Sequence, residues 1–250
     1  MNTPKRFGML TPSSNTLLEP VCSRMLSGVS EADSYFSRFR VTHISLAESS
    51  LRQFDFDPML RAAELLADAE VDVIAWNGAS GSWMGADVDR ELCDAITANT
   101  GIPATTATLA MLDALEAMDV ASCHLVTPYA PEMNELIVEQ YRLAEVTAVN
   151  VEGCSLTINR DIGSVSLETI EEMFARVSSA PADAICVPCT NFPVINHIEY
   201  LEQKYGRIIC DSIAAVVWKS MKLTGVDPRA VHGWGQLFQL GADLSAEVAT

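Results

Sequence analysis

The segment Pro188–Pro193, with the sequence PCTNFP, places a cysteine in a short loop between an apolar run and a predicted helix. We expect the Cys189 thiol to face backbone N–H groups and the positive end of that helix, which would lower its pKa below the usual value of about 8.5. Such a thiol can act as an acid, a base or a nucleophile near neutral pH. The alternative is that Cys189 is a small buried hydrophobic residue, as free cysteines commonly are.

Neutral hydrogen-bonding groups lie in the other loops of the chain. Asn15 follows the sequence TPSS, Ala79 and Ser80 follow an apolar run, Tyr129 offers a phenol, and Asn159 ends a later run. Amides, hydroxyls and N–H groups at helix N-termini are the groups with which proteins hold carboxylates. Asn15 or Ser80 alone is more typical of a turn or a helix cap. As a set, these residues predict a site for a small carboxylate.

The other cysteines suggest different roles. Cys186 and Cys189 form a CxxC pair, so a thioredoxin-like redox function is an alternative. However, Cys186 lies inside a predicted strand and should point away from the loop, whereas redox CxxC motifs open a helix. The odd number and scattered spacing of the cysteines, together with an N-terminus that does not resemble a secretion signal, predict reduced thiols and a cytoplasmic protein. We interpret the remaining five as structural: Cys22, Cys93, Cys123, Cys154 and Cys210.

The histidines and glycines match no metal or nucleotide motif. The four histidines form no HxH or HExxH cluster, so a zinc site is not supported. The sequence contains neither GxxxxGK[ST] nor a GxGxxG after a predicted strand, so both nucleotide-binding fingerprints are missing. We therefore expect no metal at the site.

Composition limits the possible partners. The 250 residues include 33 acidic and 16 basic side chains, for a net charge of −17. Without a basic stripe, nucleic acid and anionic membranes are not expected partners. The longest apolar runs, such as Ile213–Trp218, are far shorter than the roughly 20 residues of a membrane span. A length of 250 residues fits one large domain or two small ones.

Predicted strands and helices alternate along the chain, which is typical of parallel sheets covered by helices on both faces. Asp57 and Pro58 are a helix start signal, and Asp211 is a predicted cap for the last helix. The predicted strands are Phe7–Thr11, a run that ends at Thr42–Ser45, Val71–Trp76, Cys123–Val126, Val146–Ile158, Ala184–Val187 and Arg207–Cys210. The predicted helices are 59–69, Thr105–Met118, Pro131–Leu143, Leu167–Val177, Val194–Tyr205 and Asp211–Lys222.

Two parts of the chain resemble each other. The sequence DVIAWNGAS from Asp72 aligns with DAICVPCTN from Asp183, and LTPS from Leu10 aligns with VTPY from Val126. The two matches have similar offsets, which indicates a duplicated α/β unit. We predict two pseudo-symmetric parallel-sheet halves, residues 1–117 and 118–215, with residues 216–250 packing on the first half.

The duplication also predicts where the site lies. In open parallel sheets, ligands bind beyond the carboxyl ends of the strands. All four repeated loops follow strands, so two facing halves would enclose one cleft between them.

At five places the sequence resembles the maleate cis–trans isomerase branch of the aspartate/glutamate racemase superfamily, which also contains arylmalonate decarboxylase. The resemblance runs along nearly the whole chain and implies two α/β halves, a site between them and no cofactor. It also implies a homo-oligomer. The matching motifs are LTPSSNTLLEP at Leu10–Pro20, WNGASGSW at Trp76–Trp83, VTPYAPEMNE at Val126–Glu135, NRDIGSVS at Asn159–Ser166 and VPCTNFP at Val187–Pro193.

The resemblance assigns roles to individual residues. Cys189 takes the place of the second-half cysteine, and substrate-binding positions match Asn15, Gly78, Ala79, Ser80, Tyr129, Asn159 and Thr190. The chain departs from the two-cysteine members at one point, because the first-half cysteine is replaced by Gly78. In maleate isomerase that missing thiol is understood as the nucleophile. Arylmalonate decarboxylase resembles this chain in having glycine there and one cysteine on the second half.

These features leave several functions open. The whole-chain resemblance favours a cofactor-independent isomerase acting on a small (di)carboxylate, with Cys189 and Tyr129 as catalytic residues. Gly78 favours a decarboxylase in which a single cysteine delivers the proton. Racemisation by two bases is disfavoured, because only one acid/base is evident. The loss of the first cysteine also fits a non-catalytic carboxylate-binding homologue.

Overall fold

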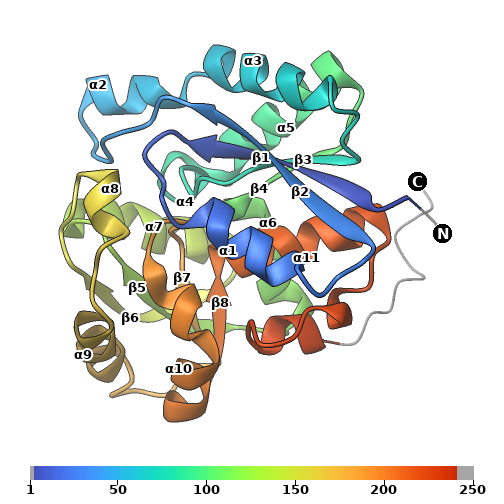
Figure 1. Cartoon of the computed structure of the whole chain (residues 1–250). Helices are drawn as coiled ribbons and strands as arrows, with labels where there is room; N and C mark the ends of the chain where they lie inside the picture. Colours follow the sequence, from blue (N-terminus) through green and yellow to red (C-terminus); the bar gives the residue numbers. More distant parts are fainter. Residues whose placement is uncertain (1–2, 241–250) are drawn as a thin grey trace.

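The computed structural model describes residues 3–240, which form two four-stranded sheets (Figure 1). The first sheet has the order β2-β1-β3-β4 and the second has the order β6-β5-β7-β8. Every strand pair in both sheets is parallel. The strands are β1 (Lys5–Pro12), β2 (Ala32–Phe39), β3 (Val73–Trp76), β4 (Ala104–Thr106), β5 (Ser122–Thr127), β6 (Thr147–Gly153), β7 (Ala184–Val187) and β8 (Ile208–Asp211). The predicted α/β class with two like halves is confirmed.

Helices cover the sheets and fill the junction between them (Figure 1). The α-helices are α1 (Leu18–Leu26), α2 (Glu48–Leu51), α3 (Phe56–Ala67), α4 (Gly81–Met84), α5 (Ala86–Thr100), α6 (Ala107–Ala117), α7 (Pro131–Leu143), α8 (Asn159–Ile162), α9 (Leu167–Val177), α10 (Ile198–Tyr205) and α11 (Ser212–Thr224). The 3-10 turns are η1 (Arg52–Phe54), η2 (Pro193–His197), η3 (Pro228–Ala230) and η4 (Gln236–Gln239). No helix within residues 3–240 is long and apolar enough to cross a membrane.

The internal repeat extends to matching hydrogen bonds at the amino ends of the strands. The carboxylate of Asp72, before β3, accepts a bond of 2.8 Å from the backbone N–H of Arg6 at the start of β1. The carboxylate of Asp183, before β7, accepts a bond of 2.8 Å from the backbone N–H of Ser122 at the start of β5. Both acids lie at the sheet edge opposite the loops, so they are tied into the scaffold and take no part in the site.

The junction between the halves is built by a matched pair of helices. Thr106, at the end of β4, caps α6, and Asp211, at the end of β8, caps α11 as predicted. The two helices pack together, and α11 also contacts β3 and β4 of the first sheet. The division of the chain at residues 117/118, just after α6, stays a proposal. The tail assigned to the first half ends in residues 241–250, which lie outside the described residues.

Several predicted boundaries were wrong, among them the start of the helix predicted from Val194, where the 3-10 turn η2 precedes α10. The first helix signal lies earlier than expected, because α3 begins at Phe56 after Asp55 rather than at Asp57. The helix predicted from Thr105 begins at Ala107, since 104–106 pair with β3 as β4. The strand predicted over 146–158 ends at Gly153, where a Cβ atom would lie 2.4 Å from the carbonyl oxygen of Tyr129. Close backbone approach at that glycine turns the chain out of the sheet.

The strand expected to end at Thr42–Ser45 was also wrong. The edge strand β2 ends at Phe39, and the residues after it leave the first sheet. There His43 forms an isolated antiparallel bridge with Ile158, and the backbone N–H of Ile44 donates to the carbonyl oxygen of Thr157 at 2.8 Å. This segment therefore connects the first half directly to the second half.

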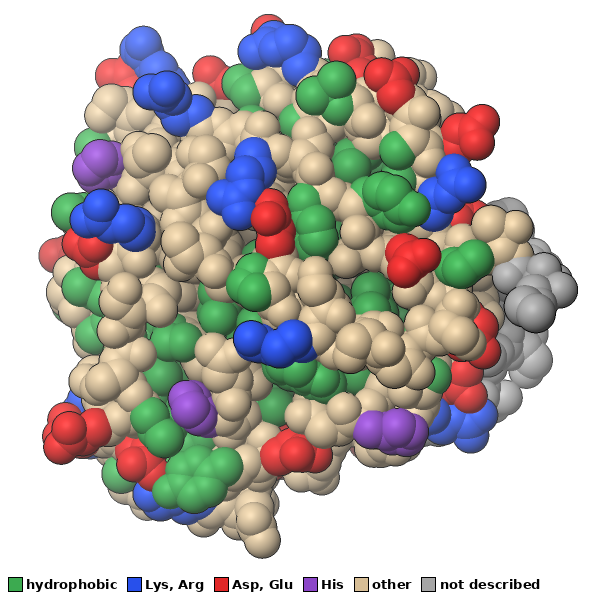
Figure 2. All heavy atoms as spheres, in the orientation of Figure 1, with side chains coloured by type: hydrophobic (Ala, Val, Ile, Leu, Met, Phe, Trp, Pro, Cys, Tyr) green, Lys and Arg blue, Asp and Glu red, His purple; other side chains and the backbone are tan. Residues whose placement is uncertain are grey.

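Charged side chains of both signs are interspersed on the face that carries α1. Figure 2 shows acidic and basic groups alternating over this face, with no continuous basic patch on it. None of the 16 Lys and Arg side chains of the chain is buried in the structure. Buried anions therefore find no cationic partner inside the protein.

Candidate active site

The Cys189 loop follows β7 at the carboxyl edge of the second sheet, where the duplication predicts a site. The Cys189 side chain is only 4% exposed. The Tyr129 hydroxyl donates to the carbonyl oxygen of Pro188 at 3.3 Å and also lies within hydrogen-bonding reach of the Cys189 thiol. The backbone N–H groups of Asn191 and Phe192 face the same sulfur. Cys189 and Tyr129 thus form a pair of buried polar groups.

The prediction of a lowered thiol pKa was wrong. Burial raises the pKa of Cys189 to about 11, and the charge of Asp211 acts in the same direction. The Tyr129 hydroxyl and the two loop amides oppose this rise but are weaker than desolvation. Pro193 starts only the five-residue 3-10 turn η2, so no long helix directs its N-terminus at the sulfur. At neutral pH Cys189 is therefore a protonated thiol.

The two halves meet through Asn15 and Thr190. The Asn15 side-chain amide donates to the carbonyl oxygen of Thr190 at 3.1 Å and to its hydroxyl at 3.3 Å. The Thr190 hydroxyl in turn donates to the carbonyl oxygen of Asn77 at 2.7 Å. The Asn15 side-chain oxygen accepts from the backbone N–H groups of Leu17 and Leu18, so it caps α1. Asn15 is thus both a helix cap and a tie between the halves.

The first-half loop is shaped by Trp76 at the end of β3. A Cβ atom added at Gly78 would lie 2.1 Å from Cζ2 of the Trp76 indole, closer than real Cβ atoms approach any atom. The indole N–H donates to the Ser80 hydroxyl at 3.2 Å, and the Phe39 ring packs on the indole at a centroid distance of 4.8 Å. Position 78 must therefore be glycine as long as Trp76 keeps this orientation. Ala79 is buried beside it, at 4% exposure.

Asn159 lies at the start of α8 and joins this region from the second half. Its side-chain amide donates to the Ser14 hydroxyl at 3.0 Å. Its carbonyl oxygen accepts from the side-chain amide of Asn191 at 2.5 Å, and the Asn191 side-chain oxygen accepts from the backbone N–H of Thr16. Sequence reasoning did not select Asn191. The repeat could have indicated it, because it aligns Asn191 with Ser80.

All eight residues selected from the sequence are buried, and together they come from both halves. They are Asn15, Gly78, Ala79, Ser80, Tyr129, Asn159, Cys189 and Thr190. Their hydrogen bonds link Asn15 with Thr190, Tyr129 with the Cys189 loop, and Asn159 with Ser14 and Asn191. The Cys189 side chain among them is almost fully shielded from solvent.

Asp211 is a second buried ionisable group near the thiol. It follows β8, in register with Val187 of β7, and burial raises the pKa of its carboxyl to about 7. One carboxylate oxygen accepts from the backbone N–H groups of Ile213 and Ala214, while Oδ2 has no partner in residues 3–240. The sequence indicated Asp211 only as a helix cap.

The other thiols do not contribute to this site. All seven cysteines are free, and Cys186 is fully buried inside β7. Cys186 lies against Cys123 and Cys210 of the neighbouring strands. A redox pair between Cys186 and Cys189 is not formed in this arrangement. Within residues 3–240 there is no group of three or more His, Cys, Asp or Glu that could hold a metal ion.

The chain is therefore an α/β protein of the class with two like parallel-sheet halves, which meet here at a buried cysteine loop. The family model for arylmalonate decarboxylase matches residues 29–238, so the chain belongs to the arylmalonate decarboxylase family, and the resemblance found in the sequence is confirmed.

The individual relatives are named either arylmalonate decarboxylase or maleate isomerase. Arylmalonate decarboxylase from Bordetella bronchiseptica is 27% identical over 158 residues, which are 62% of this chain and 66% of that protein. Maleate isomerase from Geobacillus stearothermophilus is 23% identical over 230 residues, 87% of this chain and 90% of that protein. A cysteine-to-alanine variant of the maleate isomerase from Pseudomonas putida S16, solved with maleate, has a TM-score of 0.87 at 23% identity and covers 95% of this chain and 98% of its own.

Proposed function

We propose that this protein is a cofactor-independent enzyme that acts on a small dicarboxylate, with Cys189 as its proton donor. The observation that carries the proposal is the packing of Trp76 against Gly78. Because of it, only one of the two repeated loops after β3 and β7 carries a thiol, and that thiol is Cys189. A protonated thiol suits proton delivery better than nucleophilic addition, which requires a thiolate. Decarboxylation of a malonate-type substrate is therefore the reaction that we favour.

In this reaction the bond between the α-carbon and one carboxylate breaks, and carbon dioxide leaves. The electron pair stays on the α-carbon and spreads into the remaining carboxylate as an enediolate. Neutral donors of the loops that contain Ser80, Tyr129 and Thr190 would hold that oxyanion. Cys189 then gives its proton to the α-carbon, and the resulting thiolate recovers a proton from water. The Tyr129 hydroxyl and the loop amides would stabilise the thiolate until it does.

Cis–trans isomerisation is the second candidate. The alignment with maleate isomerases extends over more of the chain than the alignment with arylmalonate decarboxylase. Here Cys189 would have to add to the double bond as a thiolate and leave again after rotation, with Tyr129 as the available proton donor. The raised pKa values of both groups oppose this route.

Proton NMR in D₂O with maleate, methylmalonate, phenylmalonate and aspartate tests the proposal. We expect a monodeuterated acid from a malonate, and loss of at least about 100-fold in rate in Cys189→Ala, because general acid catalysis commonly contributes that much. Cys186→Ala is the matched control and should retain its rate. Fumarate from maleate would support the isomerase instead. No turnover of any malonate, together with full retention of carboxylate binding, would favour a non-catalytic homologue.

A further inference from the structure

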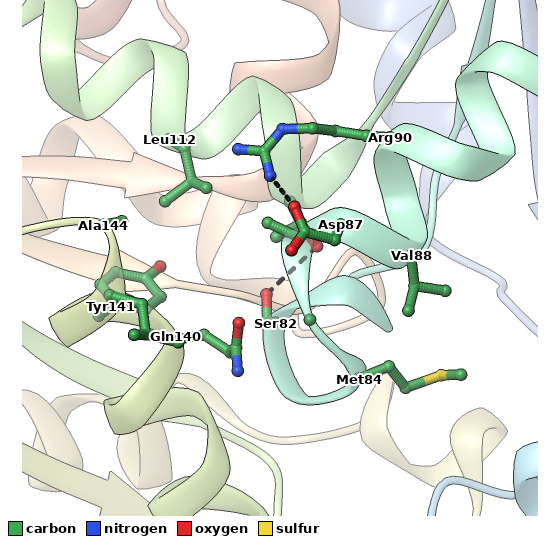
Figure 3. Close-up of a pocket in the computed structure, with 13 residues that line it drawn as sticks. Ser82, Met84, Asp87, Val88, Arg90, Leu112, Gln140, Tyr141 and Ala144 are labelled. Atoms are coloured by element: carbon green, nitrogen blue, oxygen red, sulfur yellow. Dashed lines mark hydrogen bonds and ion pairs between the residues drawn. The ribbon is translucent and has the colours of Figure 1, made fainter.

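Helix α4 follows the Gly78–Ser80 loop directly and presents two different faces. Ser82 and Met84 line a cavity of about 420 Å³ between α4, α5, α6 and α7 (Figure 3). Trp83, which lies between them in sequence, packs away from that cavity. Its ring lies 5.2 Å from the Tyr129 ring and 6.0 Å from the Phe54 ring, edge-on in both cases. Trp83 therefore packs against Tyr129, the residue whose hydroxyl lies within hydrogen-bonding reach of Cys189.

The indole N–H of Trp83 is a buried donor with no partner. The side chain is 6% exposed, and Nε1 makes no hydrogen bond within residues 3–240. By contrast, the indole N–H of Trp76 donates to the Ser80 hydroxyl within the same loop. Buried polar groups are normally paired, and an unpaired donor in a native structure calls for a functional or solvent explanation. A phenylalanine would fill such a position without this cost.

A substrate dianion in this region needs donors of this kind. None of the 16 basic side chains is buried, and the Arg38 guanidinium at the Asn15 loop already bonds the carbonyl oxygens of Ser13 and Asn15, so we expect neutral groups to supply most of the hydrogen bonds to a carboxylate beside Cys189. The Asn15 and Thr190 side chains already bond one another, whereas the Ser80 hydroxyl accepts from Trp76 and can still donate its own proton. Trp83 is a rigid donor whose hydrogen bond is not yet used.

We propose that Trp83 is a substrate-binding residue whose indole N–H donates a hydrogen bond to a carboxylate of the substrate beside Cys189. This assignment rests on the proposed function and deepens it by naming a donor that is not among the substrate-binding positions implied by the resemblance. Phe54 and Tyr129 hold the indole between them. The indole N–H is satisfied only when the anion is bound.

The test compares Trp83→Phe with its parent in a Cys189→Ala background, which prevents turnover. Malonate and maleate are the probes, and their affinity is measured by calorimetry. Thermal unfolding without ligand is measured in parallel. We expect about 10- to 100-fold weaker binding in Trp83→Phe, the range typical for a hydrogen bond to a charged group. The midpoint of unliganded unfolding should stay the same or rise, since an unpaired buried donor is removed. Trp234→Phe, a half-buried tryptophan in another part of the chain, is the control and should leave the affinity unchanged.

Each outcome decides the assignment. Equal affinity of Trp83→Phe and its parent would overturn it and leave the proposed function intact. A lower unfolding midpoint with unchanged affinity would show that the indole N–H is structural, which also overturns it. If the parent bound neither dicarboxylate, the proposed function would fail, and this assignment would fail with it.

Discussion

The indole of Trp76 occupies the space in which a side chain at Gly78 would stand. Three atoms of its six-membered ring lie 2.1–2.7 Å from the position of a Cβ atom at residue 78. The two residues therefore constrain each other, since a bulky ring at 76 requires glycine at 78. This pair explains in packing terms why a thiol can follow β7 but not β3.

Gly78→Ala should destabilise the fold by about 1–3 kcal/mol, the range typical of overpacking in a filled core. Trp76→Phe should reduce this cost, because phenylalanine does not reach the same space. The free energy of unfolding in urea, measured for both single variants and the double variant, checks the coupling. Gly28→Ala is the control, as a Cβ atom there meets nothing within 4 Å. Additive effects at positions 76 and 78 would contradict the contact.

Asn15→Ala removes both a helix cap and a tie between the halves. The cap alone is worth about 1 kcal/mol, and the bonds to Thr190 add to that loss. We expect a decrease of about 1–3 kcal/mol in the free energy of unfolding, measured by urea denaturation. Ser27→Ala, which removes an exposed hydroxyl bond to the carbonyl oxygen of Arg24, should cost much less. Equal costs of the two substitutions would contradict the stabilising role given to Asn15.

The raised pKa of Cys189 predicts how its alkylation depends on pH. Only the thiolate reacts with iodoacetamide, so the rate at Cys189 should still be rising above pH 9, with a midpoint near 11. Mapping of the labelled peptide by mass spectrometry separates Cys189 from the other thiols. A bound dicarboxylate should slow the reaction. A midpoint at or below about 8.5 would contradict the desolvated thiol described above.

Asp211 should make the stability of the protein fall as pH rises. Its folded pKa is raised from 3.8 to about 7, so the folded state binds the proton more tightly than the unfolded state. The stabilisation is complete below about pH 3.8 and is lost as pH rises through 7, with a magnitude of up to about 4 kcal/mol. Asp211→Asn keeps a side-chain oxygen for the cap of α11 but cannot ionise.

We therefore expect Asp211→Asn to flatten the stability profile between pH 5 and 8. It should also shift the alkylation of Cys189 to lower pH, because the charge of Asp211 raises the thiol pKa. Urea unfolding at a series of pH values and the alkylation assay check the two effects. Asp89 is also buried, with a pKa raised to about 6, so some dependence should remain below pH 7. A profile identical to that of the parent would contradict the role of Asp211.

Much of the fold could be predicted, because its strongest signals are local. The helices Pro131–Leu143 and Leu167–Val177 and the strand Ala184–Val187 agree with prediction at both ends. Pro131 at a helix start and the Ser166 cap mark their boundaries in the sequence. The strand β2 was missed because it lies at a sheet edge and mixes polar with apolar residues, with neither strict alternation nor a long apolar run.

The residues of the site could be predicted from the sequence, but the direction of the pKa shift of Cys189 could not. The repeat and the motifs brought the Asn15 and Cys189 loops together, because both follow parallel strands. The raised pKa of Cys189 depends on burial by residues from both halves, which no local pattern reports. The same holds for Trp76 and Trp83, whose roles follow from side-chain orientation and from the contacts that each indole makes.

The most direct test of the central claim is the configuration of the product. If Cys189 is the only proton donor and faces one side of the intermediate, an α-methyl-α-aryl malonate should give one enantiomer of the monoacid. In D₂O, that product should carry a single deuterium at the α-carbon. Chiral chromatography with mass spectrometry measures both quantities in one sample. A single enantiomer that disappears in Cys189→Ala is the predicted result. A racemic product, or one that still forms in Cys189→Ala, would contradict the account.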